Sequence, residues 1–356
     1  MHFGQRLEED RWIALARQAY DEGVRTFLTS DVYGVGKGDE LLGRALDGID
    51  RDSYCLVAMI GHDIYDGQRE GSRGYARFTD PGLRGPDGYE EYLQRATRKC
   101  AERCGTGHFD VVMLHNPDSI GYSSPEVWEA MATLKDEGLA EMTGVAPGPA
   151  NGFAIDQAYC YQNFHEQIDW AMIILNPMEP WPGRYVLPMA REFDIDILAR
   201  VVDFGGIFHD DVKPGHFFKD GDHRTYRPDG WIEHGCEKLE KMRPIAEKHG
   251  LTMLQLACIW NLSQEPVKSV GPTFIQEAGD EARPVEEKIS EFAALPDVTL
   301  TREEIETIRE IGDNEGCMPL KGASTRNEGL DPRPDQWPMR PELEPLAEKW
   351  SLNPAW

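Results

Sequence analysis

A tyrosine and a histidine, each at the end of an apolar run, have the clearest chemical potential in this sequence. Tyr33 follows the run Arg25–Ser30, and His115 ends the run Asp110–His115. A phenol can donate or accept a proton, and an imidazole can orient a polarised oxygen through a hydrogen bond. The pair therefore predicts acid–base chemistry on a small molecule, with both residues catalytic.

Other polar side chains follow similar runs, and we expect them to bind a substrate. A guanidinium suits carboxylate or polyol oxygens. A divalent-metal site is an alternative, because suitable donor atoms are present on Asp31, His62, His115 and Asp203. We expect no metal here. The expected substrate-binding residues are Asp31, His62, Asn116, Arg200 and Asp203.

Positioning these residues requires a scaffold that gathers strand ends. The apolar runs are nearly continuous, as parallel strands buried on both faces require, and they alternate with helical patterns. This alternation predicts an α/β fold, a (β/α)8 TIM-type barrel, whose active sites lie at the carboxyl ends of the strands. The expected strands are Arg25–Ser30, Tyr54–Gly61, Asp110–His115, Glu141–Pro147, Trp170–Met178, Asp194–Asp203 and Lys268–Phe274.

Seven strands are one fewer than a closed barrel has, and the first is the one not seen. We expect that strand to be missing or atypical, or the barrel to close in another way. The barrel is expected over residues 1–316, with a long loop at 209–235 that covers the site or packs on the rim. Residues 317–356 are expected to be an extension packed on the barrel.

The composition narrows the class of partner. A net charge of -26 repels phosphate backbones and anionic lipid, so we expect a small-molecule substrate, no nucleic acid and no membrane. We find no secretory signal at the start. The seven cysteines are odd in number and scattered, which favours reduced thiols in the cytoplasm. Cys100 and Cys104 lie four apart on an expected helix, but no second pair completes a metal site. The sequence does not set an oligomeric state.

Several segments resemble the aldo-keto reductase superfamily, in order, over roughly residues 3–312. Tyr33 and Gly34, followed by a helix with Gly43, Ala45 and Leu46, are similar to the family's signature. The segment DVVMLHNPD at 110–118 resembles the strand that ends in the family's catalytic histidine. The resemblance implies that Tyr33 donates a proton to a carbonyl, His115 orients it and a nicotinamide cofactor delivers hydride.

Two of the family's four polar catalytic residues have no counterpart. The family's aspartate falls at Leu28, and its lysine falls at Met59 or Ile60. The paired loss is coherent, because a buried lysine without its carboxylate is costly. Lys37, four residues after Tyr33, is the alternative cation.

The resemblance also implies cofactor-binding residues, namely Asn176, Gly205, Gly206 and Thr273. The loop after the last strand, however, reads GPTFIQEAGDEARPVEEK and is mostly acidic up to Arg283. Acidic side chains repel a 2′-phosphate, so NAD is favoured over NADP, and binding of no dinucleotide is also open. The position of the family's nicotinamide-stacking aromatic is Arg200.

Three functions follow from these observations. The first is an oxidoreductase acting on the carbonyl or hydroxyl of a small polar, sugar-like compound. The second is a non-redox lyase, dehydratase or isomerase that uses Tyr33, His115 and Arg200 without bound nicotinamide. The third is a regulatory or binding protein that kept the fold, against which the retention of Tyr33 and His115 argues.

Overall fold

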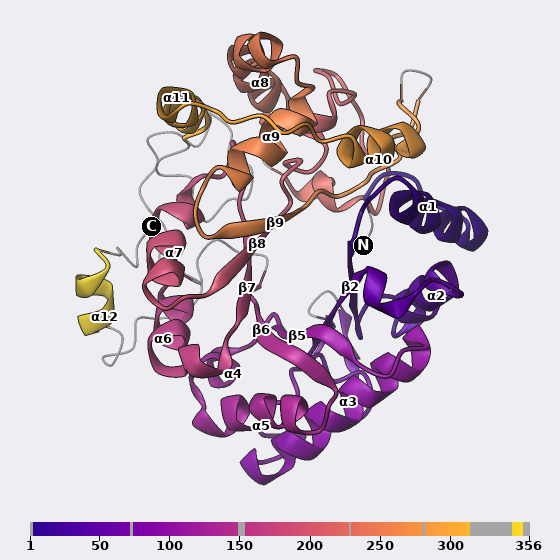
Figure 1. Ribbon diagram of the computed structural model, residues 1–356, viewed down its shortest axis with the longest axis vertical. Coiled ribbons are helices and arrows are strands. Elements are labelled where there is room, and N and C mark those ends of the chain that lie inside the picture. Colours follow the sequence, from indigo (N-terminus) through magenta and orange to yellow (C-terminus); the bar gives the residue numbers. More distant parts are fainter. Residues whose placement is uncertain are drawn as a thin grey trace.

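The chain alternates strands and helices around one curled parallel sheet. A computed structural model describes residues 3–71, 74–148, 154–227, 229–279, 282–313 and 344–351. Figure 1 shows the helices arranged around the outside of the strands, so the expected α/β barrel-type fold is confirmed. The strands follow the order β1 (Thr26–Ser30), β2 (Cys55–Ile60), β5 (Phe109–His115), β6 (Ala140–Ala146), β7 (Trp170–Ile174), β8 (Asp196–Arg200) and β9 (Val267–Gly271).

Helices follow most strands and cover the outer face of the sheet. Two of them begin with reciprocal side-chain caps, Thr252 with Gln255 and Thr301 with Glu304, which satisfy free backbone N–H groups. The helices are α1 (Glu9–Asp21), α2 (Lys37–Leu46), α3 (Tyr89–Cys104), α4 (Ser119–Ser123), α5 (Pro125–Asp136), α6 (Ala154–Phe164), α7 (Trp181–Glu192), α8 (Trp231–His249), α9 (Met253–Leu262), α10 (Val285–Ala293), α11 (Arg302–Gly312) and α12 (Glu344–Lys349).

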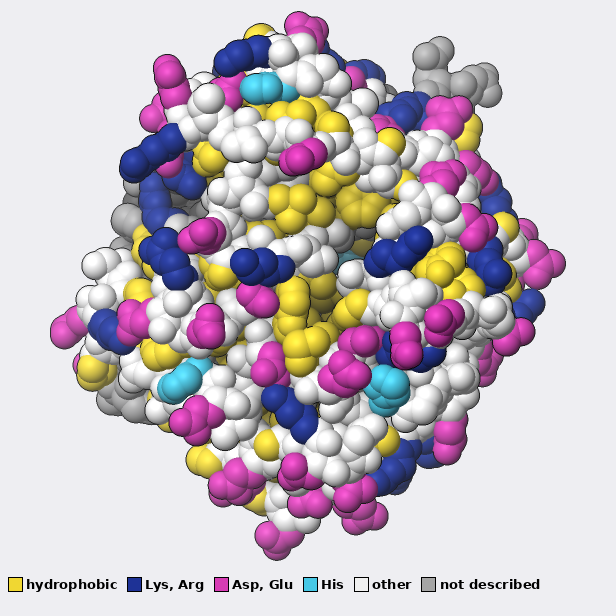
Figure 2. Space-filling model, viewed as in Figure 1, with side chains coloured by type: hydrophobic (Ala, Val, Ile, Leu, Met, Phe, Trp, Pro, Cys, Tyr) yellow, Lys and Arg dark blue, Asp and Glu magenta, His cyan; other side chains and the backbone are white. Residues whose placement is uncertain are grey.

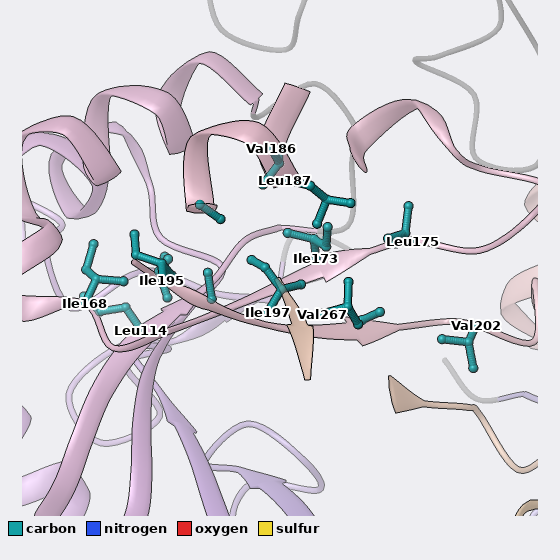
Figure 3. Packing of buried hydrophobic residues seen from close by; sticks show 14 of the residues in the cluster. Leu114, Ile168, Ile173, Leu175, Val186, Leu187, Ile195, Ile197, Val202 and Val267 are labelled. Atoms are coloured by element: carbon teal, nitrogen blue, oxygen red, sulfur yellow. The ribbon is translucent and has the colours of Figure 1, made fainter. Parts of the chain in front are cut away.

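The strands from β1 to β8 in the seven-stranded sheet place residues on two apolar sides, one against the helices and one inside the barrel. Figure 3 shows Ile173 below Val186 and Leu187 of α7, and Ile195 beside Ile168. The opposite face forms a separate apolar cluster in the barrel interior, which is methionine-rich. Its buried members are Val57, Met59, Val111, Met113, Ala146, Met172 and Leu198, with Leu28, Cys55, Met142 and Trp170 packed against them.

The expected last three strands are shorter in the structure than the apolar runs. The run Trp170–Met178 leaves the sheet after Ile174, where Asn176 and Glu179 form an isolated bridge. The run Asp194–Asp203 leaves it after Arg200, because Val201 takes a positive φ of 58° that no strand accommodates. The run Lys268–Phe274 ends as a strand at Gly271.

The described sheet has two edges, β1 and β9, as the count of seven strands predicted. Residues of both edge strands line one shared hollow of ≈250 Å³, among them Thr26 from β1 and Ser269 from β9. Residues near the start of the chain cross to the loop after β9, where the Gln5 N–H donates to the carbonyl of Gln276 at 2.8 Å.

Two further features concern the periphery. Of the C-terminal extension 317–356, residues 344–351 are described. Here α12 buries Leu346 and Ala347, and Lys349 pairs with Glu192 of α7 at 2.9 Å. None of the described helices combines the length and the apolar character needed to cross a bilayer. Figure 2 shows acidic side chains spread over one face of the molecule.

Candidate active site

Tyr33 and His115 converge at the carboxyl ends of β1 and β5. Their ring centroids lie 5.9 Å apart with an interplanar angle of 86°, an edge-on contact. The one intervening strand, β2, sets this spacing, because it pairs in parallel with β1 on one side and with β5 on the other. The two side chains that the sequence put forward as catalytic therefore share one part of the barrel mouth.

A chain of hydrogen bonds runs behind His115. The Ser30 hydroxyl lies 2.7 Å from Nδ1 of His115 and 3.2 Å from Oδ1 of Asp31. The other oxygen of Asp31 accepts the N–H of Gly61 at 3.0 Å. Ser30 and Asp31 are both fully buried. Asp31 therefore supports His115 from behind, and sequence reasoning missed Ser30 as the link.

A second imidazole packs against the first. The rings of His62 and His115 lie 4.9 Å apart. Nη1 of Arg77 lies 3.1 Å from Nδ1 of His62, and the Asn116 amide nitrogen lies 3.2 Å from Nε2. Arg77 can only donate, so Nδ1 of His62 accepts and Nε2 carries the hydrogen. The Asn116 side chain can accept this Nε2 hydrogen of His62 when its amide oxygen, rather than its nitrogen, faces the imidazole ring.

Both imidazoles are neutral near pH 7. Burial, followed by the Arg77 charge, lowers the pKa of His62 to about 3. Burial also lowers the pKa of His115 well below its ordinary value, and the neighbouring His62, Arg200 and Arg77 add to this effect. A neutral imidazole can donate from one nitrogen and accept at the other, which suits orientation of a substrate oxygen.

Tyr33 stands at the open side of this group, with 47% of its surface exposed. Desolvation in the crowded mouth raises the pKa of Tyr33, and the Arg200 charge opposes that increase. Arg200 ends β8 and donates to the carbonyl oxygens of Pro147 and Gly148 at 2.8 and 3.1 Å. Its Nε is buried without a hydrogen-bond partner. Arg200 thus supplies positive charge near the phenol.

The backbone turns through the left-handed region just after each of these strand ends. Val35, Asn116 and Val201 have φ values of 58°, 47° and 58°. A β-branched residue in this region is a rare outlier that costs of the order of 1–3 kcal/mol, and such residues cluster at functional sites. Val35 and Val201 place this strain near Tyr33 and Arg200, whereas Asn116, next to His115, is of a residue type that tolerates the left-handed region.

The barrel interior below the site is apolar at the positions where the resemblance places an aspartate and a lysine. Leu28 and Met59 both belong to the methionine-rich interior cluster, whereas Ile60 faces the helices. Of the two positions expected for the lysine, Met59 is the one on the interior face. The side chain of Lys37, the alternative cation, does not point to Tyr33. Its Nζ lies 3.2 Å from Glu9 and 3.4 Å from Glu40 at the surface.

Asp203 joins two loops on the far side of the mouth. Its carboxylate accepts the N–H of Gly206 at 2.8 Å and that of Thr273 at 2.7 Å. The carbonyl of Thr273 in turn receives Nε2 of His209 at 2.8 Å. Asp203, expected to bind substrate, thus uses both oxygens within the protein. Asp203 is also absent from the described groups whose ligand atoms are close enough to share a metal ion.

Asn176 is likewise engaged within the chain. Its amide donates to Glu179 at 2.8 Å and to the carbonyl of Val201 at 2.9 Å, and it accepts the N–H of Met178 at 2.9 Å. The residues expected to bind a cofactor, namely Asn176, Gly205, Gly206 and Thr273, therefore gather at one side of the mouth, around the loops that follow β7, β8 and β9.

The positively charged side chains of these loops differ in whether a nearby carboxylate pairs with them. Arg224 is buried between Asp222 and Glu277, to which it donates at 2.8 and 2.5 Å, and Lys288 pairs with Asp211 at 2.6 Å. Arg227 is different. Its Nη1 is buried without a hydrogen bond and lies 3.9 Å from Glu179.

Gly205 gives Arg227 room. A side chain on Gly205 would begin 3.7 Å from Nη2 of Arg227 and 3.5 Å from the Trp231 ring. The glycine takes a φ of 63°, which L-residues rarely adopt. The guanidinium of Arg227 thus borders a stretch of bare backbone, the kind of surface on which a phosphate can rest.

Sequence comparisons agree with this architecture. The model of the aldo/keto reductase family matches residues 1–313. The chain is 23% identical to versiconal hemiacetal acetate reductase of Aspergillus parasiticus over 349 residues, covering 85% of this chain and 87% of that protein. It is 24% identical to probable aldo-keto reductase 1 of Glycine max over 307 residues, covering 82% and 81%.

Solved structures share the fold. The chain superposes on a glycerol dehydrogenase from Gluconobacter oxydans with a TM-score of 0.68 and 19% identity, covering 95% of this chain and 90% of that one. An aldo/keto reductase from Klebsiella pneumoniae, in complex with NADP and acetate, gives a TM-score of 0.59 at 18% identity, covering 88% and 90%. With the family match spanning most of its length, the chain belongs to the aldo/keto reductase family, a family of oxidoreductase enzymes.

Proposed function

We propose that this enzyme interconverts the carbonyl and hydroxyl forms of a small polar, sugar-like substrate. Tyr33 exchanges the proton with the substrate oxygen, and His115 orients that oxygen. The observation that carries the proposal is the edge-on approach of the Tyr33 and His115 rings at 5.9 Å, with the positive charge of Arg200 acting on the phenol. Arg200 here takes over the electrostatic role of the absent lysine.

The polar side chains around the pair suit a hydroxylated substrate. His62 uses both ring nitrogens on Arg77 and Asn116, but one atom of the Asn116 amide has no partner and can bind a substrate hydroxyl. The unpartnered Nε of Arg200 can donate to a substrate hydroxyl or carboxylate. The name of the Gluconobacter oxydans neighbour, a glycerol dehydrogenase, is in keeping with a small polyol. Asp31 acts through Ser30 in this scheme, without touching the substrate.

The residues present fit a nicotinamide dinucleotide, which supplies or takes up hydride when bound. Arg227 would hold a phosphate beside Gly205, because its buried Nη1 has no hydrogen bond of its own. The more distal cations Arg224 and Lys288 are already paired with buried carboxylates. A 2′-phosphate would therefore meet acidic side chains, which favours NAD over NADP although neighbours carry NADP.

Fluorescence titration of the purified protein with NADH and NADPH tests this proposal. We expect NADH to bind about fivefold more tightly than NADPH, since two like charges about 4 Å apart in water repel by about 1 kcal/mol. Arg227→Ala should weaken both, whereas the exposed Lys219→Ala serves as the control. A protein that binds neither nucleotide would end the oxidoreductase proposal.

One observation favours a second candidate, a non-redox lyase or isomerase. Leu28 and Met59 leave the phenol without the buried lysine that the family uses. Tyr33 and His115 could then move a proton between substrate carbons while Arg200 holds an anionic substrate. Turnover in the complete absence of nicotinamide would support this candidate, and strict dependence on added nicotinamide would exclude it.

A further inference from the structure

A buried cluster of metal-ligating side chains lies outside the barrel mouth. Asp39, Cys100 and Cys104 each offer one ligand atom, and these three atoms lie within 4.8 Å of one another. Asp39 and Cys100 are fully buried and Cys104 is 8% exposed. The proposed chemistry of Tyr33 and His115 uses none of the three.

The cluster joins two helices that are far apart in the sequence. Asp39 lies in the first turn of α2, and Cys100 and Cys104 lie one turn apart at the end of α3. Residues four apart on a helix share a face, so both thiols point at α2. The sequence showed the thiol pair but not its third member, because only the packing of α2 on α3 adds the carboxylate.

Asp39 is held in place by two neighbours. The Thr29 hydroxyl donates to Oδ1 at 2.5 Å, and Nε of Arg103 donates to Oδ2 at 2.9 Å. Nη2 of Arg103 also lies 2.8 Å from Oδ2. A carboxylate oxygen has two acceptor positions, so Oδ1, which receives only the Thr29 hydroxyl, keeps one for a metal ion. A carboxylate fixed by outer partners in this way is typical of metal ligands.

We propose that Asp39, Cys100 and Cys104 form a binding site for a soft divalent cation of the zinc type. Zinc binds thiolates at about 2.3 Å and carboxylate oxygens at about 2.0–2.2 Å, so its tetrahedral ligands lie about 3.5–3.8 Å apart. The present spacing needs a contraction of about 1 Å at most. A water molecule can complete the tetrahedral coordination.

The charges balance when the cation is bound. Two thiolates and one carboxylate carry three negative charges, and a dication with the Arg103 guanidinium carries three positive charges. Arg103 already pairs with Asp39 at 2.8 Å, so the balancing charge is in position. Neutral clusters of this kind avoid the cost of an uncompensated buried charge.

A surface hollow reaches one member of the cluster, Cys104. The hollow has a volume of ≈810 Å³ and is lined by Arg103 and Cys104 from α3 and by Glu40, Gly43 and Arg44 from α2. Because zinc binds thiolates, binding must release thiol protons and strengthen as the pH rises.

Cadmium and zinc titrations of the chelator-treated full chain test the proposal. We expect one equivalent of Cd²⁺ to give the ultraviolet charge-transfer band of a thiolate complex, and zinc to displace it. Cys100→Ser should lower the affinity by roughly 100-fold, since loss of a mere outer partner costs about 10–100-fold. Cys258→Ser, which removes a buried thiol of α9 outside the cluster, is the matched control and should bind as the wild type does.

Two further measurements make the outcome decisive. Circular dichroism identifies any variant that fails to fold, and Asp39→Asn then provides an independent test, with an expected loss of affinity and a retained two-thiolate band of lower stability. The proposal is overturned if the wild type binds no cadmium, or if both cluster variants bind as tightly as Cys258→Ser. It is also overturned if Cys100 and Cys104 form a disulfide under mild oxidation while zinc gives no protection.

Discussion

The Ser30 hydroxyl lies 2.7 Å from Nδ1 of His115, and the same hydroxyl lies 3.2 Å from Asp31. This relationship lets the protonation of Asp31 set which nitrogen of His115 carries hydrogen. Burial raises the pKa of Asp31 to about 7. Below that pH, protonated Asp31 donates to Ser30 and Ser30 donates to Nδ1, so Nε2–H is free to bind a carbonyl. Above it, ionised Asp31 accepts from Ser30, and Nδ1–H donates instead.

The first prediction concerns the pH profile of carbonyl reduction. We expect kcat/KM to fall as the pH rises through about 7, because His115 then loses its donor at Nε2. Ser30→Ala removes the hydroxyl that connects His115 to Asp31, so kcat/KM should no longer fall as the pH rises through about 7. Ser263→Ala, at the end of α9, is the matched control. An unchanged inflection in Ser30→Ala would exclude the relay.

The second prediction concerns stability. Because the folded pKa of Asp31 is raised above its ordinary value of 3.8, the unfolded chain ionises first. The stability linked to this group is full below about pH 4 and is lost as the pH rises to about 7. Asp31→Asn should therefore raise the free energy of unfolding by a few kcal/mol at pH 8, and by much less at pH 4. Urea unfolding at the two pH values measures this. Equal effects at both pH values would contradict the assignment.

The third prediction concerns Arg200. Its charge lowers the pKa of Tyr33 against the effect of desolvation, so Arg200→Met should raise that pKa further. Ultraviolet difference titration of tyrosinate, with Tyr33→Phe as the reference, reports the change. Arg200→Lys keeps the positive charge, so the pKa of Tyr33 should stay close to its wild-type value. If Arg200→Met leaves the titration of Tyr33 unmoved, Arg200 does not replace the family's lysine.

The fourth prediction concerns the apolar interior. Leu28→Asp and Met59→Lys each place an unpaired charge in the interior cluster, at an expected cost of about 3–5 kcal/mol. The double variant recreates the family's ion pair and should recover at least 1 kcal/mol relative to the sum of the single changes. A double-mutant cycle by denaturant unfolding measures the coupling. Strict additivity would mean that the two positions do not face each other.

The fold could be predicted because its signals are local. Near-continuous apolar runs such as Asp110–His115 marked strands buried on both faces, and all seven expected strands are present. Their ends were harder to predict. The runs after residues 174 and 200 continue in apolar residues, but the backbone leaves the sheet at turns such as Val201, which no residue type announces.

The site was predictable only where a residue stands at a strand end. Tyr33 and His115 do, and they meet. Ser30 and Arg77 were missed for different reasons. Ser30 has no distinctive chemistry until Asp31 and His115 are seen on either side of it. Arg77 belongs to the loop between β2 and α3, and only its antiparallel bridge with His62 brings it to the mouth.

Other candidate site residues use their polar atoms in contacts with distant parts of the chain. Asp203 and Asn176 form hydrogen bonds with loop backbone, which the sequence could not reveal. Nor could it show that Arg224 lies between Asp222 and Glu277. Such pairings join residues up to 70 positions apart, as in Asp203 with Thr273. Long-range contacts of this kind leave no periodic signal in the chain.

Transfer of deuterium from labelled NADH to a panel of small aldehydes and ketoses, in wild type and Tyr33→Phe, tests the central claim most directly. The account predicts deuterium on the former carbonyl carbon with the wild type, and a rate about 10²–10⁴-fold lower without the phenol hydroxyl. Deuterated product formed at an undiminished rate by Tyr33→Phe would contradict it.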